Sequence, residues 1–282
     1  MSKVIALITK DGKPTFNSEL QSLANIDELN APERSIIIKV GVFNPIKGIY
    51  TSTNTLEAIV KGFNKAPRIL IAESDSYGGP ALERLNIWRD VFSKKVIPFN
   101  LTTDKNTRKV RVVDEIVGIS QSVFKPNVFV STHVPRRYEG TGKTDLMNMG
   151  SIIKNLLGLI PDIKKYRFHE KLPVALLDIY ERIEGIDLAV LDATRTFLGV
   201  KRKHRIVETN LILIGRDAIS VEAVGAYLVG FDPLKMPVLQ EAMDRGSGEA
   251  NIENIEVVGT SIESIREKVI KSFNELLPCP TR

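Results

Sequence analysis

Residues 35–42 read Ser-Ile-Ile-Ile-Lys-Val-Gly-Val, a nearly continuous run of β-branched side chains. Such a run is typical of a strand that is buried on both faces of a parallel sheet. Residues 68–73 and 128–132 form two more runs of this kind. Helical signals follow the first two runs: residues 53–64 space apolar side chains i, i+3, i+4, i+7, and residues 80–91 begin with a proline at a natural first-turn position. The alternation predicts an α/β fold with a mostly parallel mixed sheet and helices on both of its faces.

The same alternation extends to both ends of the chain. Because no internal repeat, low-complexity segment or flexible linker interrupts it, we expect residues 1–282 to form a single α/β domain. Residues 135–150 have no clear period, and we expect them to form a mobile loop inserted into this domain. The remaining strands are expected at residues 4–9, 95–100, 108–113, 188–191, 209–214 and 255–258, and the remaining helices at 151–157, 172–183, 217–228 and 262–277.

Composition excludes several classes of protein. No apolar run reaches the roughly 18 residues that a membrane helix needs. The apolar run at residues 4–9 is too short for a signal peptide and reads as a first strand. The single cysteine, Cys279, can neither form an internal disulfide nor ligate an iron–sulfur cluster. One cysteine favours a reducing compartment, so we expect a globular cytoplasmic protein without a membrane partner.

The positive charge of the chain is concentrated in two segments. The formal net charge is +5. Residues 133–169 hold seven Lys or Arg against three Asp or Glu, and residues 195–205 hold five Lys or Arg and no acid. Basic clusters in a cleft focus the electrostatic field and attract anions, whereas the alternative is two solvated loops. We therefore expect an anion to bind near one of these segments.

Residues 140–144 read Gly-Thr-Gly-Lys-Thr and follow a strand, which invites comparison with a phosphate-binding loop. The comparison fails, because the pattern needs a glycine where Arg137 stands and a helix that starts at once. A looser role stays open, in which backbone amides and Lys143 line an anion site.

Acidic side chains follow two of the predicted strands. Asp75 comes shortly after the strand at 68–73, and Asp192 directly follows the strand at 188–191. Ligands of open parallel sheets bind beyond the carboxyl ends of the strands. We therefore expect Asp75 and Asp192 to position a base or a divalent ion, the alternative for each being a turn or a helix cap.

Lys154, Asn155 and His169 form the densest polar cluster of the basic stretch. A lysine beside an asparagine suits a carboxylate or phosphate, which it would bind by charge and hydrogen bonds; the alternative for Lys154 is a solvated helix face. A histidine titrates near neutrality, so an acid or base role is open for His133 and His169, and we expect His169 to transfer a proton.

Two other kinds of site lack support. The three histidines show no metal-ligand spacing, so no residue is assigned as a metal ligand, and the cofactor, including a divalent metal, stays open. No Gly-x-Ser-x-Gly elbow occurs, and neither Ser74 nor Ser76 has a partner evident in the sequence. The sequence therefore predicts no serine nucleophile.

Four features follow one another in order between Ile36 and Val258, and together they resemble the family known as domain of unknown function 362. The resemblance implies the fold and a set of polar positions, including Asn44, but no activity. Arg136 and Glu222 depart from the family, which usually has lysine and aspartate there, and one cysteine excludes the iron–sulfur segment of many members. The first feature is Ile37-Ile38-Lys39 with Asn44-Pro45, and the second is Val134-Pro135 followed by Lys154-Asn155, Gly158, Lys164 and His169. The third feature is Val190-Leu191-Asp192, and the fourth is the stretch 216–224 with Gly230-Phe231-Asp232-Pro233.

Two functional hypotheses follow. In the first, the protein is an enzyme or a ligand-binding protein for a small anionic metabolite in a cleft at the strand carboxyl ends. In the second, it binds nucleic acid through residues 136–167 and 195–205, although the sparse aromatic residues there argue against stacking on single strands. The first requires Lys39, Asp75, Lys154, His169 and Asp192 to converge on one cleft. In it, Lys39, Asn44, Arg136, Lys143 and Lys154 bind negative groups, Asn155 orients them, His169 transfers a proton, and Asp75 and Asp192 position a base or a divalent ion.

Overall fold

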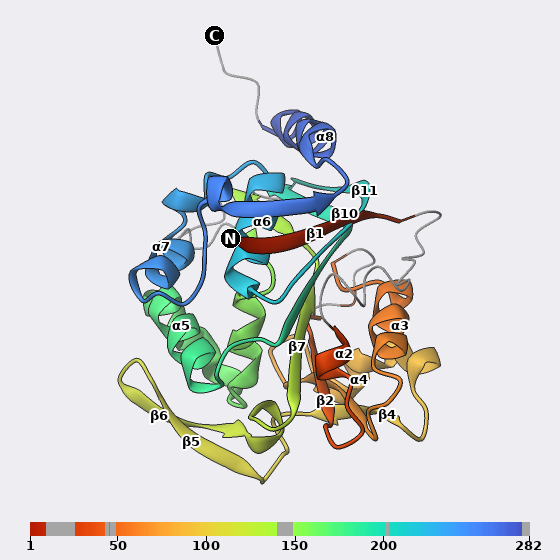
Figure 1. The fold of residues 1–282 in the computed structure, drawn as a ribbon. Helices are drawn as coiled ribbons and strands as arrows, with labels where there is room; N and C mark the ends of the chain where they lie inside the picture. The colour runs from red at the N-terminus through yellow and green to blue at the C-terminus, as the bar shows by residue number, and fades with distance from the viewer. Residues whose placement is uncertain (10–25, 43–44, 46–48, 140–148, 201–202, 278–282) are drawn as a thin grey trace.

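The computed structural model shows an α/β fold built on a mixed, mostly parallel sheet (Figure 1). It describes residues 1–9, 26–42, 45, 49–139, 149–200 and 203–277. The main path of the sheet has the strand order β12-β1-β11-β10-β7-β2-β3-β4. Neighbours along this path pair in parallel, except that β11 runs antiparallel to both β1 and β10. The strands are β1 Ser2–Ile8, β2 Ile36–Val40, β3 Ile69–Glu73, β4 Val96–Asn100, β7 Val128–His133, β10 Leu188–Val200, β11 Lys203–Gly215 and β12 Ile255–Gly259.

Helices cover both faces of the sheet, as the sequence predicts. Side chains alternate along a strand, so Ile36 and Ile38 of β2 pack with one apolar cluster and Ile37 with the other. Helices α2 and α3 with α4 and η1 pack on the first face, and η4, α5, α6, α7 and α8 contribute to the second (Figure 1). The helices are α2 Ile26–Leu29, α3 Thr53–Gly62, α4 Ala81–Leu85, η1 Asn86–Val91, η2 Gln121–Val123, η4 Lys154–Leu159, η5 Ile163–Lys171, α5 Leu172–Arg182, α6 Ala218–Leu228, η6 Pro233–Lys235, α7 Pro237–Asp244, η7 Ile252–Asn254 and α8 Glu263–Asn274.

The segment that was expected to be a loop, residues 135–150, has a strand at each described end. β8 (Arg136–Glu139) pairs in parallel with the second half of β10, and β9 (Met149–Gly150) pairs antiparallel with β8. Residues 140–148, with the Gly-Thr-Gly-Lys-Thr motif, lie outside the described residues. The sequence shows no alternation of apolar and polar residues here because β8 is short and half-buried, so neither face of the strand needs apolar side chains.

Three further elements differ from the expectation. The strand expected to stop before Asp192 continues to Val200, because its later residues pair with β8 and β11. The helix expected at 80–91 divides into α4 and η1, with non-helical backbone at Trp88. The hairpin of β5 (Thr107–Val112) and β6 (Glu115–Ser120) forms a separate sheet, of which only the first strand was expected.

The length and hydropathy of the described helices show whether any of them could span a membrane. None of them is both long enough and apolar enough to cross a bilayer.

Candidate functional site

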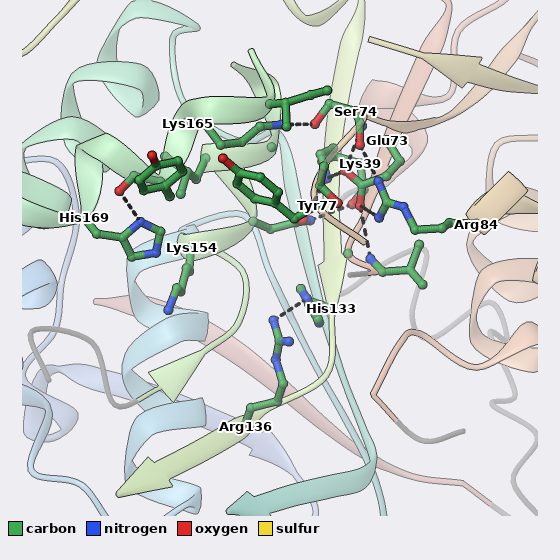
Figure 2. Close-up of a pocket in the computed structure, with 18 of the residues that line it drawn as sticks. Lys39, Glu73, Ser74, Tyr77, Arg84, His133, Arg136, Lys154, Lys165 and His169 are labelled. Atoms are coloured by element: carbon green, nitrogen blue, oxygen red, sulfur yellow. Dashed lines mark hydrogen bonds and ion pairs between the residues drawn. The ribbon is translucent and has the colours of Figure 1, made fainter. Parts of the chain in front are cut away.

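A cavity of about 460 Å³ lies at the carboxyl ends of β2, β3 and β7. Its wall on the sheet side is formed where these strands end, and η4 and η5 supply the opposite side (Figure 2). This is the place where parallel sheets bind ligands. The lining residues are Lys39, Gly41, Val42, Glu73, Ser74, Ser76, Tyr77, Arg84, His133, Arg136, Tyr138, Lys154, Asn155, Leu157, Gly158, Ile163, Lys165, Tyr166 and His169.

The charge of the cavity wall is unbalanced. Glu73 is the one carboxylate among the lining residues that the structure describes. Lysine and arginine side chains from five different elements, β2, α4, β8, η4 and η5, line the same cavity. A wall of this composition attracts anions. The basic lining residues are Lys39, Arg84, Arg136, Lys154 and Lys165.

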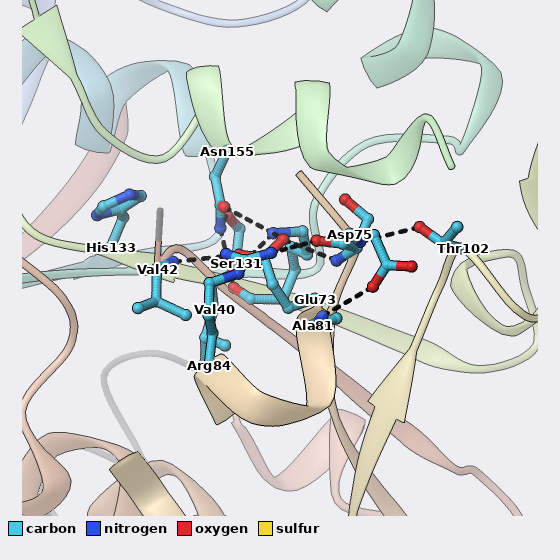
Figure 3. Close-up of polar contacts among 12 residues, drawn as sticks. Val40, Val42, Glu73, Asp75, Ala81, Arg84, Thr102, Ser131, His133 and Asn155 are labelled. Carbon is cyan, nitrogen blue, oxygen red and sulfur yellow. Dashed lines mark hydrogen bonds and ion pairs between the residues drawn. The ribbon is translucent and has the colours of Figure 1, made fainter. Parts of the chain in front are cut away.

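Lys39 forms the buried base of the cavity and is 1% exposed. Its ammonium donates to Val40 O at 2.7 Å, to Glu73 Oε1 at 2.8 Å and to Asn155 Oδ1 at 3.0 Å, so all three of its N–H donors have a partner (Figure 3). Burial lowers the pKa of Lys39, and the negative charge of Glu73 opposes this shift. The complete set of acceptors makes Lys39 a positioning group.

Asn155 and Glu73 tie the strand ends to this lysine. The Asn155 amide donates to Lys39 O at 2.9 Å and to Ser131 Oγ at 3.2 Å. Glu73 accepts from Ser74 N at 2.8 Å and from Val42 N at 3.1 Å. A Cβ added to Gly158 would lie 2.8 Å from Lys39 Nζ, so η4 approaches this closely only because a glycine stands there. The network therefore fixes β2, β3, β7 and η4 relative to one another.

Arg136, Lys154 and His133 form a second group, at the opposite end of the cavity (Figure 2). Arg136 has a buried Nε without a hydrogen-bond partner among the described residues. Burial lowers the pKa of Lys154 to about 8, and the positive charge of Arg136 adds to this effect, while Glu222 opposes it. Within the described residues, neither Arg136 nor Lys154 lies within 4 Å of a carboxylate oxygen. This end of the cavity thus concentrates positive charge that no carboxylate of the described residues pairs with directly.

The ring of His133 has donors on both sides. Val134 N–H points to Nδ1 at 2.7 Å, and the Arg136 guanidinium lies 2.7 Å from Nε2. Burial, together with the charges of Arg136, Lys39 and Lys154, holds the pKa of His133 well below its usual value, so the ring is neutral and carries one N–H. Whichever nitrogen carries it, one of the two contacts brings two donors together. Because Val134 N–H donates to Nδ1, the ring proton lies on Nε2, and the conflict is with the guanidinium; an anion that lies beside both groups would accept from each of them.

His169 lies at the cavity wall on η5 with one nitrogen already bonded. Its Nδ1 lies 2.8 Å from Tyr166 O, and because a carbonyl only accepts, Nδ1 carries the proton and Nε2 has the lone pair. Burial and the nearby charge of Lys154 lower the pKa of His169, and its bond to Tyr166 O opposes them. A neutral imidazole with a fixed tautomer suits proton acceptance.

Lys165 and Ser74 meet beside Glu73. Lys165 Nζ lies 2.5 Å from Ser74 Oγ and 3.0 Å from Asp75 O. Burial lowers the pKa of Lys165 to about 8, Lys39 and Arg84 contribute in the same direction, and Glu73 and Asp75 oppose it. In the sequence, Lys165 stands out only as one of several basic residues, and Ser74 has no evident partner. The pair cannot be seen there because the two residues lie on different elements.

Asp75 and Asp192, two residues expected in the site, do not line the cavity. Asp75 Oδ1 accepts from Ala81 N at 2.7 Å, at the start of α4, and from Asn100 Nδ2 at 3.0 Å (Figure 3). Asp192 is fully buried and accepts from Ser52 N at 2.6 Å and from Thr194 N at 3.0 Å. Both carboxylates satisfy backbone N–H groups, so the helix-cap alternative fits Asp75, and Asp192 anchors the segment that begins α3.

The other expected site residues divide into two sets. Lys39, Arg136, Lys154, Asn155 and His169 all line the cavity. Of the five residues that were required to converge, Lys39, Lys154 and His169 do so and Asp75 and Asp192 do not, so the requirement of the first hypothesis is met only in part. Asn44 and Lys143 lie outside the described residues.

Other lining residues were not predicted to form the site. Glu73 is the last residue of the strand run at 68–73, so the strand-end argument made for Asp75 covers it as well, although only Asp75 was given a role there. His133 stands at the end of its strand and was open as an acid or base, whereas Arg84 and Tyr77 have no comparable signal, because their contact with the cavity depends on how α4 and the end of β3 pack.

Two arginines of the second basic segment form ion pairs within the protein. Arg195 lies 3.5 Å from Glu208, and Arg205 lies 2.5 Å from Glu275. In the first segment, Arg137 donates to Val229 O and stacks over the Phe273 ring at 3.7 Å. These side chains are committed to internal contacts, which leaves fewer charges for a nucleic-acid backbone.

Metal binding finds no preformed ligand group in the described part of the chain, where no cluster of three or more His, Cys, Asp or Glu side chains could hold an ion. The single cysteine excludes a cysteine-ligated iron–sulfur cluster.

Comparison with known proteins gives one match. A family described as "Domain of unknown function (DUF362)" matches residues 36–227, which is more than half of the chain and includes the strand ends and helices that form the cavity. No curated protein matches the chain.

Proposed function

The chain belongs to the DUF362 family, a domain of unknown function, and from its cavity we propose that it binds a small metabolite through a carboxylate or phosphate group. The anionic group is held by Arg136, Lys154 and the ring N–H of His133. The observation that carries the proposal is the pair of donors at His133 Nε2 and Arg136, 2.7 Å apart, with Lys154 beside them. Oxygen atoms of an anion would accept hydrogen bonds from all three groups.

His169 provides the chemistry in this proposal. Its Nε2 lone pair is free of any hydrogen bond among the described residues, while Nδ1 is held by Tyr166 O at 2.8 Å. Because Lys154 lies close enough to His169 to lower its pKa, an anion bound at Lys154 is close to the base as well. We therefore assign His169 as the group that accepts a proton from the bound molecule.

The remainder of the cavity suits an apolar body. Leu157, Ile163 and the rings of Tyr77 and Tyr166 line it, and the two rings lie 5.6 Å apart between centroids. A ligand with one charged end and an unsaturated or aliphatic remainder would match both parts of the wall.

The test is calorimetric titration with succinate and with inorganic phosphate as probes. Arg136→Met and Lys154→Met each remove a charge-assisted hydrogen bond, and we expect the dissociation constant to rise at least about tenfold. Lys164→Met is the matched control, because Lys164 is exposed and does not line the cavity. Equal affinities in wild type and Lys154→Met would refute the proposal.

Nucleic acid is the alternative outcome of the same experiment. Binding of a DNA or RNA duplex that falls steeply with added salt, and that is unchanged in Arg136→Met, would favour the exposed basic surface over the cavity. A small anion held by two or three groups in the cavity depends on salt much less steeply.

A further inference from the structure

Ser74 and Lys165 occupy the end of the cavity away from Arg136 (Figure 2). Their side chains come from the end of β3 and from η5, which are far apart in sequence, and Lys165 Nζ lies 2.5 Å from Ser74 Oγ. We propose that Ser74 is a nucleophile activated by Lys165, and that the protein transfers the acyl group of an ester that carries an anionic group. The choice of an anionic ester rests on the proposed function, whereas the serine–lysine pair stands on its own geometry.

The Ser74 hydroxyl is held in place by the backbone around it. Ser74 N donates to Glu73 Oε1 at 2.8 Å, and Ser74 O accepts from the Arg84 guanidinium. Both backbone groups of the residue are therefore fixed, and the hydroxyl is left for Lys165. A nucleophile needs such a fixed position relative to its base.

Lys165 is oriented in turn by a third group. Its Nζ lies 3.0 Å from Asp75 O, to which it donates. A neutral amine can donate one hydrogen to this carbonyl and accept the Ser74 hydroxyl proton with its lone pair. Asp75, expected to act through its carboxylate, takes part here through its backbone, and its side chain holds the start of α4 at Ala81.

Burial favours the neutral amine and the nearby cations favour the alkoxide, while the carboxylates of Glu73 and Asp75 oppose both effects. Burial lowers the pKa of Lys165 to about 8, so a substantial fraction of the amine is neutral near physiological pH. Lys39 and Arg84 lie near enough to Lys165 to lower its pKa further, and the same cations stabilise negative charge on Ser74 Oγ. The pairing of a lysine base with a serine nucleophile is a known alternative to the serine–histidine arrangement.

The reaction balances with water as the second substrate. Ser74 Oγ forms a bond to the carbonyl carbon of the ester as its proton moves to Lys165 Nζ. The bond from that carbon to the alcohol oxygen breaks, and the leaving oxygen takes the proton from Lys165. Water then attacks the acyl carbon and gives a proton to Lys165; the bond from that carbon to Ser74 Oγ breaks, and Oγ takes the proton from Lys165. The products are a carboxylic acid and an alcohol.

Labelling with diisopropyl fluorophosphate tests the pair directly, because the reagent is uncharged and does not need the anion-binding end. Attack by Ser74 Oγ forms a phosphorus–oxygen bond, expels fluoride and sends the serine proton to Lys165. We expect one adduct, located on Ser74 by peptide mass spectrometry, with a labelling rate that rises as the pH passes about 8. An adduct on Ser76, or none on Ser74, would overturn the proposal.

Variants of the two residues distinguish a Ser74 hydroxyl activated by Lys165 from a Ser74 hydroxyl that the reagent merely reaches. Ser74→Ala should abolish labelling, and Lys165→Met should slow it at least about 100-fold, the usual scale of a general base. Lys165→Arg keeps the positive charge but cannot accept the serine proton, so it should slow labelling by the same factor. It replaces Lys165→Met in the test if the methionine variant fails to fold. Lys164→Met, on the exposed side of η5, should label at the wild-type rate. A wild-type labelling rate in folded Lys165→Met or Lys165→Arg would refute activation by Lys165.

The substrate class needs a separate arm. Hydrolysis of mono-4-nitrophenyl succinate, which carries a carboxylate, is compared with that of neutral 4-nitrophenyl acetate. Arg136→Met should raise KM at least about tenfold for the first ester and leave the second unchanged. Normal Ser74 labelling with no difference between the esters would retain the pair and overturn its link to the anion. Anion binding without Ser74 labelling would overturn the serine–lysine pair and retain the anion-binding site.

Discussion

Glu73→Gln removes the negative charge from the buried base of the cavity. Glu73 faces Lys39 at 2.8 Å, and the two side chains are 8% and 1% exposed. The glutamine keeps the size of the side chain, but its NH2 group must face donors, because Lys39, Ser74 N and Val42 N all donate to Glu73. Breaking a buried ion pair by removing one partner lowers the free energy of unfolding by about 3–5 kcal/mol. For a chain of this size, that corresponds to a melting temperature lower by about 6–20 °C.

Urea unfolding followed by tryptophan fluorescence measures this effect, since the single tryptophan, Trp88, is fully buried. The control is Asp114→Asn, which breaks the ion pair of Asp114 with Lys171 at 2.9 Å on the surface and should lower stability far less. Lys39→Met combined with Glu73→Gln should recover part of the loss, because Lys39 is then no longer a buried charge without its partner, whereas buried Arg84, 3.9 Å from Glu73 in the wild type, still lacks its carboxylate. A Glu73→Gln protein as stable as Asp114→Asn would refute the assignment of this pair as the structural anchor of the cavity.

Three further predictions follow from the same contacts. Succinate, whose carboxylates stay ionised, should bind more weakly as the pH rises through about 8, because Lys154 then loses the charge that holds the anion. Titration calorimetry should show a smaller loss of succinate affinity over this pH range in Lys154→Met than in the wild type. Gly158→Ala, whose Cβ would lie 2.8 Å from Lys39 Nζ, should lower the free energy of unfolding by about 1–3 kcal/mol, whereas Gly62→Ala in α3, where a Cβ meets nothing within 4 Å, should raise it slightly; equal effects would refute the close approach. Asp192→Asn should lower the free energy of unfolding by about 1–3 kcal/mol, because its amide would face the donors Ser52 N and Thr194 N, and it should leave succinate affinity unchanged; a large loss of affinity would place Asp192 in the site after all.

The sequence alone determined the fold class and five of the residues that line the cavity. The run at 35–42 is apolar at consecutive positions, which only a strand covered on both faces can bury, so the parallel sheet and its two helical layers follow from the pattern. Lys39 interrupts that run, and a lysine in a buried strand needs partners, so its position already indicated a polar site. Lys154, Asn155 and His169 follow from their density in one basic stretch.

Tertiary structure alone decided which of these groups meet. Asp75 and Asp192 stand at sequence positions typical of ligand sites, but their oxygens satisfy backbone N–H groups, and hydrogen bonding to a helix start leaves no trace in the local pattern. Ser74 and Lys165 show the opposite case, since each is unremarkable in sequence and the packing of η5 against the end of β3 brings them within 2.5 Å. The pKa of Lys165 near 8 likewise depends on burial and on Lys39 and Arg84. Periodicity fixes which residues are buried, whereas contacts between distant elements set the chemistry of the side chains, and those contacts exist only in the folded chain.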